Sequence, residues 1–220
     1  MPMTKIQPTG VEASGIVSSG RAFEFFKTYV KDKSATVVDV GCGNGAFLSK
    51  LMDSDYANIS GVEAVEYPML KKFLVKFVDI CSERLPQKNA SCDAATAWEV
   101  FEHIENPRHL IREIHRILKP GGFLFISVPN VFHLMSRLMF LRQGNFPRWT
   151  DENDHYNIFT NQVFKKLFLK EFDLIKKTYY LPEIGKGFLH PIISRLKFLD
   201  RYLPENELFS HFVVYILKKR

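Results

Sequence analysis

The sequence is poor in cysteine. Its 220 residues include three, Cys42, Cys81 and Cys92, an odd number without paired spacing. A disulfide framework uses cysteines in pairs, and a structural zinc site uses cysteine or histidine ligands at short, regular spacings. Neither pattern organises this chain. A reducing cytoplasm is therefore the expected location.

Long apolar runs and blocks of like charge are also lacking. No apolar run approaches the roughly 18 residues needed to span a bilayer. Residues 1–20 lack the regions of a signal peptide and are rich in Gly, Ser, Thr and Pro, so we expect a mobile arm or lid there. The net charge of +6 would suit an acidic partner, but the basic residues are scattered. Nucleic-acid binding is therefore not expected.

The composition is that of an ordinary globular protein. Hydrophobic residues make up 46% and charged residues 25%, and the length suits one domain over residues 1–220. β-branched or apolar runs predict strands at residues 36–40, 58–62, 74–78, 93–98 and 123–128. Helical segments are expected between them, at residues 46–52, 67–72 and 107–118, and before them at 21–30. This alternation predicts parallel β-α-β units.

The alternation of predicted strands and helices ends after Asn130. Amphipathic, aromatic segments are expected at residues 131–142 and 188–203, with a helix from Thr160, which reads as its N-cap. Two late strands, at residues 172–180 and 211–217, suggest an antiparallel edge. The segment 188–203 is basic and could rest on a membrane surface or face the core.

The segment VVDVGCGNG, Val37 to Gly45, is the informative stretch. Its glycines permit backbone conformations that a Cβ would block, and they let the loop approach a ligand. The loop opens a helix, whose amino terminus favours anionic groups. The run Gly41 to Ala46 also satisfies a looser dinucleotide fingerprint, and Glu63 stands at a suitable spacing for either kind of cofactor. An NAD-dependent oxidoreductase is therefore one alternative.

Three features favour a different cofactor. Asp39 lies inside the strand before the loop, where a carboxylate suits a positive ammonium group and is unhelpful beside a pyrophosphate. Asp79 ends the third strand, placed to accept the adenine amino group, with Ile80 beside the ring. The segment LKPGGFL, residues 118–124, joins a helix to the fifth strand.

With these motifs in order, the chain resembles class I S-adenosylmethionine (SAM)-dependent methyltransferases of the small-molecule type, and it is similar to the group that includes ubiquinone-biosynthesis methyltransferases. The resemblance runs from about residue 36 to 130. It rests on VVDVGCGNG, GVE (61–63), VDI (78–80), LPQKNASCDAATAWEVFEHIENP (85–107) and LKPGGFLFISVPN (118–130). It implies a Rossmann-like three-layer α/β sandwich with a seven-stranded, mostly parallel sheet in the order 3-2-1-4-5-7-6, strand 7 being antiparallel.

The resemblance also implies roles for the cofactor residues. Asp39 would help hold the methionine end of SAM, and Glu63 would bind the ribose hydroxyls. Asp79 and Ile80 would bind adenine. Trp98 and Glu99 would flank the methionine moiety. The cofactor loop would consist of Gly41, Cys42, Gly43 and Gly45.

Two histidines are candidate bases for an oxygen acceptor, because an imidazole titrates near neutral pH. His155 lies in DHYNIFT, where relatives carry a similar stretch, and Tyr156 beside it could face the acceptor. His103 lies in WEVFEH, where a helical turn would put Glu99, Glu102 and His103 on one face. That face suits either a divalent cation or hydrogen bonds that hold the loop, and no metal ligand is assigned. Asn130 stands where relatives line the acceptor pocket.

The variable half, residues 131–210, is expected to cap the acceptor. Its aromatic side chains favour an apolar, aromatic or lipid-linked small molecule, methylated at oxygen. A non-catalytic SAM-fold binding protein is the main alternative. An enzyme acting on RNA or protein is less favoured, because Trp98-Glu99-Val100-Phe101 stands where many such enzymes carry Asn/Asp-Pro-Pro-aromatic.

Overall fold

A single seven-stranded sheet forms the centre of the computed structural model, which describes residues 15–18, 20–151, 154–180 and 204–220. The strand order is β3-β2-β1-β4-β5-β7-β6. Strands β1 to β5 pair in parallel, and β7 is antiparallel to both of its neighbours, β5 and β6. The predicted sheet is therefore confirmed. The strands are β1 (Thr36–Val40), β2 (Asn58–Glu63), β3 (Val75–Phe77), β4 (Cys92–Trp98), β5 (Leu118–Pro129), β6 (Phe172–Tyr180) and β7 (Phe212–Lys219).

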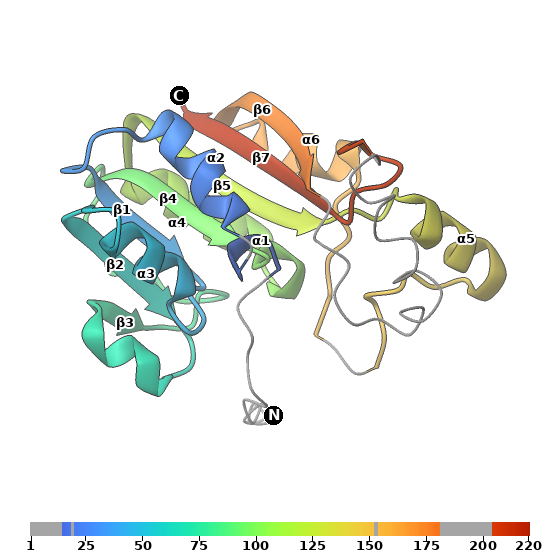
Figure 1. Cartoon of the computed structure of the whole chain (residues 1–220), viewed down its shortest axis with the longest axis horizontal. Coiled ribbons are helices and arrows are strands. Elements are labelled where there is room, and N and C mark those ends of the chain that lie inside the picture. Colours follow the sequence, from blue (N-terminus) through green and yellow to red (C-terminus); the bar gives the residue numbers. More distant parts are fainter. Residues whose placement is uncertain (1–14, 19, 152–153, 181–203) are drawn as a thin grey trace.

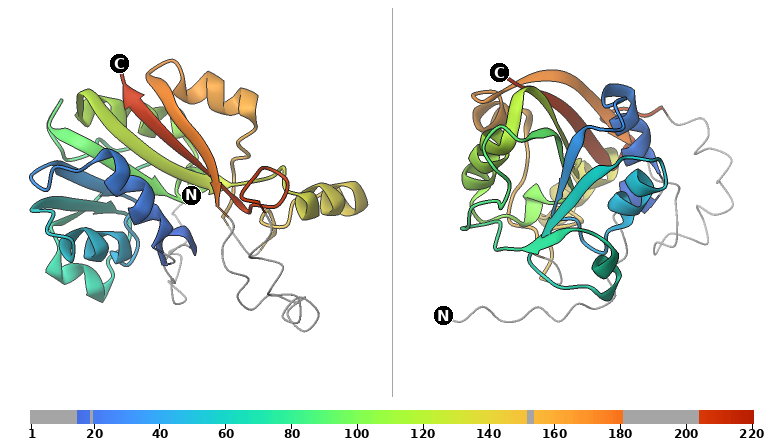
Figure 2. Two further views of the ribbon diagram at one scale, coloured as in Figure 1. Left: turned by 45° about the horizontal axis from the view of Figure 1, so that its top comes forward. Right: turned by 90° about the vertical axis from the view of Figure 1, so that its left-hand side faces the viewer.

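Helices cover both faces of the sheet and complete the three layers (Figures 1 and 2). One core joins the sheet to α1 (Gly15–Ser18), α2 (Arg21–Tyr29) and α3 (Ala46–Met52), through Ile16, Phe26 and Phe47. The other joins it to α4 (Pro107–Ile117) and α6 (Asn161–Phe168), through Ile114 and Phe164. Each helix thus buries one apolar stripe.

The start of β5 differs from the predicted turn. The helix was expected to run to residue 118 and residues 119–122 to end it, yet the strand already begins at Leu118, which pairs with Cys92. The register then shifts, so that Ala94 pairs with Phe123. Gly121, at φ +76°, lies in the extra length of chain that this irregularity absorbs. The Pro-Gly-Gly run therefore bends a strand rather than separating two elements.

The chain after Asn130 departs from regular layers. The helix α5 (Leu134–Gln143) projects beyond the end of the sheet (Figures 1 and 2). The predicted cap of α6 is confirmed, because the Thr160 side chain accepts a hydrogen bond from the Val163 amide. The predicted segment 188–203 and most of the predicted arm lie outside the described residues, while the end of that arm forms α1 and buries Ile16.

The short turns complete the connections: η1 (Pro68–Lys72) leads into β3, and η2 (Phe101–His103) follows β4. Because β1, β2 and β4 run in parallel, their carboxyl ends meet at one edge of the sheet. That edge carries Asp39, Glu63 and Glu99 within or just after the strands. In open α/β sheets, ligands bind at this edge.

Candidate functional site

The glycine loop between β1 and α3 is fixed to the neighbouring strand. The amides of Gly41 and Cys42 both donate to the carbonyl of Val62, at 2.8 and 3.1 Å. A Cβ on Gly41 would lie 2.6 Å from Val100 Cγ2, so a side chain there would displace the loop. Gly45 has φ +78° and precedes α3. These glycines are required by backbone conformation and close packing.

Gly43 is different, because a Cβ on it would meet nothing within 4 Å. Its amide donates to Glu63 Oε2 at 2.6 Å, while Glu63 Oε1 accepts from the Ala64 amide at 2.8 Å. The middle of the loop therefore borders open space beside a carboxylate at the end of β2. These features fit the adenosyl part of SAM, whose ribose hydroxyls need such an acceptor.

Asp39 is 2% exposed and lies between β2 and β4. Its carboxylate accepts a hydrogen bond from Thr96 Oγ1 at 2.5 Å. Loss of hydration on burial raises the pKa of Asp39 to about 7, against the opposing effect of the Thr96 bond. The carboxyl group is therefore poised between its two charge states near neutral pH. A nearby cation would favour the charged form.

The adenine and methionine candidates occupy different surroundings. Asp79 accepts from the Ser82 hydroxyl at 2.6 Å and the Cys81 amide at 2.9 Å. The bond from Ser82 contributes most to lowering its pKa. Ile80 is 7% exposed. Trp98 packs edge-on against Phe47, with ring centroids 5.5 Å apart, and its indole nitrogen is buried without a partner among the described residues.

Glu99 lies at the carboxyl end of β4, next to the residues that were predicted to contact the acceptor. It follows β4 with φ +54°, an uncommon conformation for a side-chain-bearing residue, and its amide donates to Ser127 Oγ at 3.0 Å. Arg148 reaches it from the loop after α5, with 3.6 Å between guanidinium and carboxylate. This contact joins the variable half of the chain to the end of β4.

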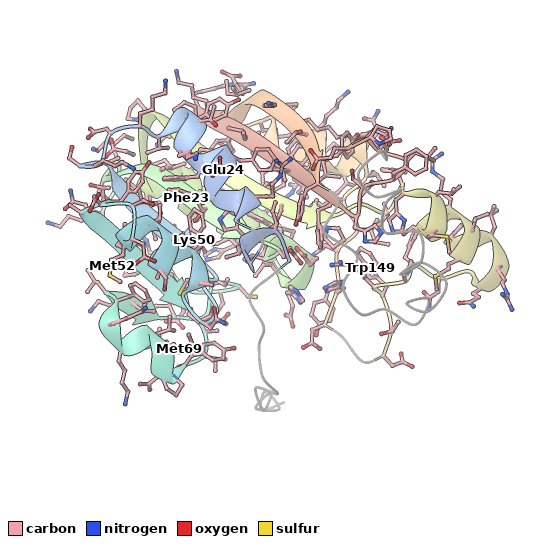
Figure 3. The ribbon with its side chains drawn as sticks, in the orientation of Figure 1. Phe23, Glu24, Lys50, Met52, Met69 and Trp149 are labelled. Carbon is pink, nitrogen blue, oxygen red and sulfur yellow. The ribbon has the colours of Figure 1, made fainter. Side chains whose placement is uncertain are left out.

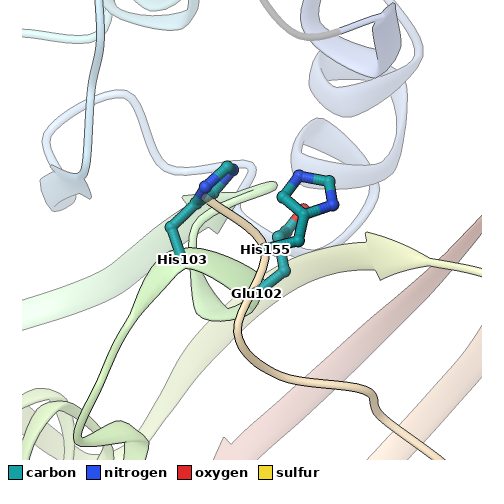
Figure 4. Close-up of side chains that lie close together, drawn as sticks. All are labelled: Glu102, His103 and His155. Atoms are coloured by element: carbon teal, nitrogen blue, oxygen red, sulfur yellow. The ribbon is translucent and has the colours of Figure 1, made fainter. Parts of the chain in front are cut away.

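Glu102, His103 and His155 converge beside it (Figure 4). Their potential ligand atoms lie within 4.8 Å of one another, and the two imidazole centroids are 4.5 Å apart. Glu102 is fully buried, and burial raises its pKa well above the usual range. Burial also lowers the pKa of His155 to about 4, and that of His103 falls for the same reason. Both histidines are consequently neutral at pH 7.

The structure therefore brings His103 and His155 together. The carbonyl of Asp154, which is 51 positions from His103, contacts the Nδ1 of His103 at 3.0 Å. The structure also replaces the expected face of Glu99, Glu102 and His103 by a cluster in which His155 takes the place of Glu99. The backbone explains this exchange. The Tyr156 and Asn157 amides both donate to the Glu102 carbonyl, at 2.7 and 3.1 Å, and so hold the His155 loop against η2.

Asn130 and Tyr156, the two residues expected to contact the acceptor, lie in different surroundings. Asn130 is buried, and its amide donates to the carbonyls of Glu207 and Ser210, each at 2.7 Å. This side chain thus anchors the segment before β7. Tyr156 is 62% exposed and points away from the core.

Sequence reasoning did not select Arg148. It lies in a polar loop without periodicity, and only its position in space shows that it reaches both Glu99 and the ring of Phe212. Trp149 follows it, between the end of the sheet and α5 (Figure 3). The two aromatic residues that flank it, Phe146 and Trp149, are the one signal that could have indicated it.

Comparisons with known proteins agree with this geometry. A family model described as a methyltransferase domain matches residues 17–174. The ubiquinone biosynthesis O-methyltransferase of Pseudomonas paraeruginosa (strain DSM 24068 / PA7) is 35% identical over 104 residues, which cover 43% of this chain and 44% of the relative. That of Pseudomonas syringae pv. tomato is 35% identical over 103 residues, with the same shares. The match thus spans less than half the length of these curated relatives.

Solved structures share the fold. A SAM-dependent methyltransferase from Archaeoglobus fulgidus has a TM-score of 0.63 at 21% identity, covering 94% of this chain and 95% of its own. The [4+2]-cyclase SpnF has a TM-score of 0.61 at 19% identity, covering 91% and 80%. No helix of the described part of the chain is long and apolar enough to cross a membrane. From the family match, the chain belongs to the methyltransferase domain family, and it shares its Rossmann-like fold with SAM-dependent methyltransferases of known structure.

Proposed function

We propose that this chain transfers the methyl group of SAM to an oxygen atom of a small-molecule or lipid-linked acceptor. The observation that carries the proposal is the position of His155, a neutral imidazole with a buried, unpartnered Nδ1 among the described residues, at the edge of the sheet that bears the glycine loop. The curated relatives that match at 33–35% identity are named O-methyltransferases, which supports oxygen as the acceptor atom.

The cofactor would be held by groups along the carboxyl edge. Asp39 would face the positive methionine end, and Glu63 the ribose, where it now accepts the amides of Gly43 and Ala64. Asp79 and Ile80 would meet adenine, and Trp98 and Glu99 the methionine chain. When bound, SAM supplies a methyl group already activated by its sulfonium charge. The remaining task of the protein is to align the acceptor, which can contribute several kcal/mol.

His155 is the proposed general base. A pKa of about 4 leaves the ring unprotonated at pH 7, so it can accept the proton that the acceptor hydroxyl loses. His103 stands 4.5 Å away, centroid to centroid, and after burial its ring is the next largest contribution to the lowered pKa of His155. His103 therefore helps to keep His155 neutral at pH 7, and it also makes the ring a weaker base.

A divalent cation is a second candidate at the same place. Glu102 offers two buried, unpartnered oxygens, and both histidines offer nitrogen atoms. One carboxylate with two imidazoles suits Zn²⁺ or another transition ion better than Mg²⁺, which prefers oxygen ligands. Such an ion would supply Lewis acidity to the acceptor hydroxyl. Turnover that survives prolonged chelation, with no metal in the purified protein, would favour the base alone.

The apolar character of the variable half supports an apolar or lipid-linked acceptor. Large side chains stand exposed along α5, and the ring of Phe140 stacks on Phe146 with centroids 4.9 Å apart. A helix that leaves so much apolar surface uncovered marks a contact with an apolar ligand or surface. The exposed side chains are Leu134, Met135, Leu138, Phe140 and Leu141.

A methyl-transfer assay tests this proposal. The purified chain is incubated with methyl-labelled SAM and a panel of phenols and catechols, with and without a prenyl tail. We expect label on oxygen, reduced at least tenfold in His155→Ala while SAM affinity is retained. His115→Ala is the matched control, because His115 packs on Phe172 away from the site. Wild-type turnover in His155→Ala would remove it as the base, and no transfer to any acceptor would favour a binding protein.

A further inference from the structure

Arg148 occupies an unusual position for a loop arginine. Its guanidinium lies over the ring of Phe212, with the central carbon 4.3 Å from the ring centroid, and its side chain remains 37% exposed. Stacking on an aromatic ring holds the planar group in one orientation while its N–H donors stay available at the edge. Phe212 begins β7, so the stack fixes the arginine at the acceptor side of the sheet.

The positive charge of Arg148 has only one nearby carboxylate partner, at a long distance, among the described residues. Among the described residues it forms one ion pair, with Glu99 at 3.6 Å, which exceeds the distance of a strong charge-assisted hydrogen bond.

A second donor lies beside the arginine. The indole nitrogen of Trp149 is buried and has no hydrogen-bond partner among the described residues. Its ring contacts that of His155 edge-on, with centroids 5.3 Å apart. A buried N–H without a partner costs free energy, which a bound acceptor atom would recover. Arg148 and Trp149 therefore offer N–H groups from adjacent residues close to the proposed base.

From this arrangement we infer that Arg148, with the indole N–H of Trp149, forms a binding site for an oxyanion of the methyl acceptor, either a carboxylate or a phosphate. The planar guanidinium matches both groups, since each presents two oxygens to its paired donors. The inference rests on the proposed function, because the oxyanion would hold the acceptor with its hydroxyl near His155. It adds a charged group to an acceptor that is otherwise apolar.

Binding of simple probes tests the site without requiring turnover. Benzoate, phenyl phosphate and neutral benzamide are titrated, in the presence of S-adenosylhomocysteine, into the full chain and followed by protein chemical shifts. We expect benzoate or phenyl phosphate to bind at least tenfold more tightly than benzamide. The tighter of the two identifies the oxyanion as carboxylate or phosphate. Equal binding of all three, or binding of none, would overturn the site.

Two variants of Arg148 and a matched control test whether this arginine causes the preference for anionic probes. Arg148→Gln should abolish the preference for an anionic probe, and Arg148→Lys, which keeps the charge but loses the fork and the stack, should retain a reduced preference. Arg142→Gln removes the same charge from an exposed position on α5 and should leave it unchanged. A preference that persists in folded Arg148→Gln, or that is lost equally in Arg142→Gln, would contradict the assignment.

Failure of the anion site and failure of the proposed methyl transfer give different results. If neutral catechols are methylated but the anionic probes gain nothing from Arg148, the inference fails and methyl transfer stands. If anionic probes bind through Arg148 but no hydroxyl is methylated, the anion site stands and the assignment to an oxygen acceptor fails.

Discussion

The backbone amide of Gly43 donates a 2.6 Å hydrogen bond to the carboxylate of Glu63, which ties the glycine loop to the end of β2. Two residues that are 20 positions apart thereby border the same open space. The other oxygen of the carboxylate is held by the Ala64 amide at 2.8 Å. A carboxylate fixed in this way is preorganised to accept hydrogen bonds from a ligand's hydroxyl groups.

Glu63→Ala should weaken binding of SAM at least tenfold. The variant loses the proposed acceptor of the ribose hydroxyls and also the contact that holds Gly43. Glu66→Ala, which removes an exposed carboxylate from the same connection, is the control and should bind as the wild type does. Calorimetric titration measures both. Equal affinities in the two variants would exclude Glu63 from the cofactor site.

Asp39 predicts a pH-dependent affinity for SAM. Its pKa of about 7 means that the group is largely protonated below neutral pH and charged above it. Because a positive methionine end favours the charged form, affinity should rise from pH 6 to pH 8 and then level off. Asp39→Asn should bind at least tenfold more weakly at pH 8 and lose this pH dependence. An unchanged slope in the variant would assign the titration to another group.

The same residue predicts a change in stability with pH. The pKa of Asp39 is raised in the folded state, so its contribution to folding is fully present below the unfolded pKa and is lost as pH rises through about 7. Asp39→Asn carries no such charge. The melting temperature of the variant relative to the wild type should therefore increase from pH 5 to pH 8. A difference that is constant or decreases with pH would show that Asp39 does not bear a raised pKa.

Two glycines of one loop should respond differently to alanine. Gly43→Ala adds a methyl group to open space, so we expect a loss of about 1–2 kcal/mol from its positive φ and weaker SAM binding. Gly45→Ala places its Cβ 2.8 Å from Phe73 Cε2 and 3.0 Å from Leu70 Cδ2, which should cost roughly 1–3 kcal/mol more. Thermal unfolding with and without SAM separates the two effects. Equal melting temperatures would contradict the packing assigned to Gly45.

Local chemistry was sufficient to predict the regular part of the fold. The β-branched run at residues 36–40 and the alternation that follows it predict buried parallel strands, and the hydroxyl of Thr160 predicts the start of α6. These signals depend on residues near one another in the sequence. The shift of register before Phe123 was not predictable, because it depends on how β4 and β5 meet.

The acceptor side depends on contacts between distant segments. Glu102 is buried, and the amides of Tyr156 and Asn157 donate to its carbonyl, but no sequence period relates these residues. Arg148 meets Phe212 for the same kind of reason. Asn130 remains a predicted acceptor residue, and the structure adds that its amide donates to the carbonyls of Glu207 and Ser210. Spatial proximity alone distinguishes these roles.

The most direct measurement is a calorimetric titration of the purified chain with SAM, S-adenosylhomocysteine and NADH. Binding of the first two with micromolar affinity, about −8 kcal/mol, and no heat with NADH is the result predicted by the Asp39, Glu63 and glycine-loop geometry. Binding of NADH without SAM would contradict it, because a pyrophosphate-bearing cofactor would then occupy the loop beside Asp39.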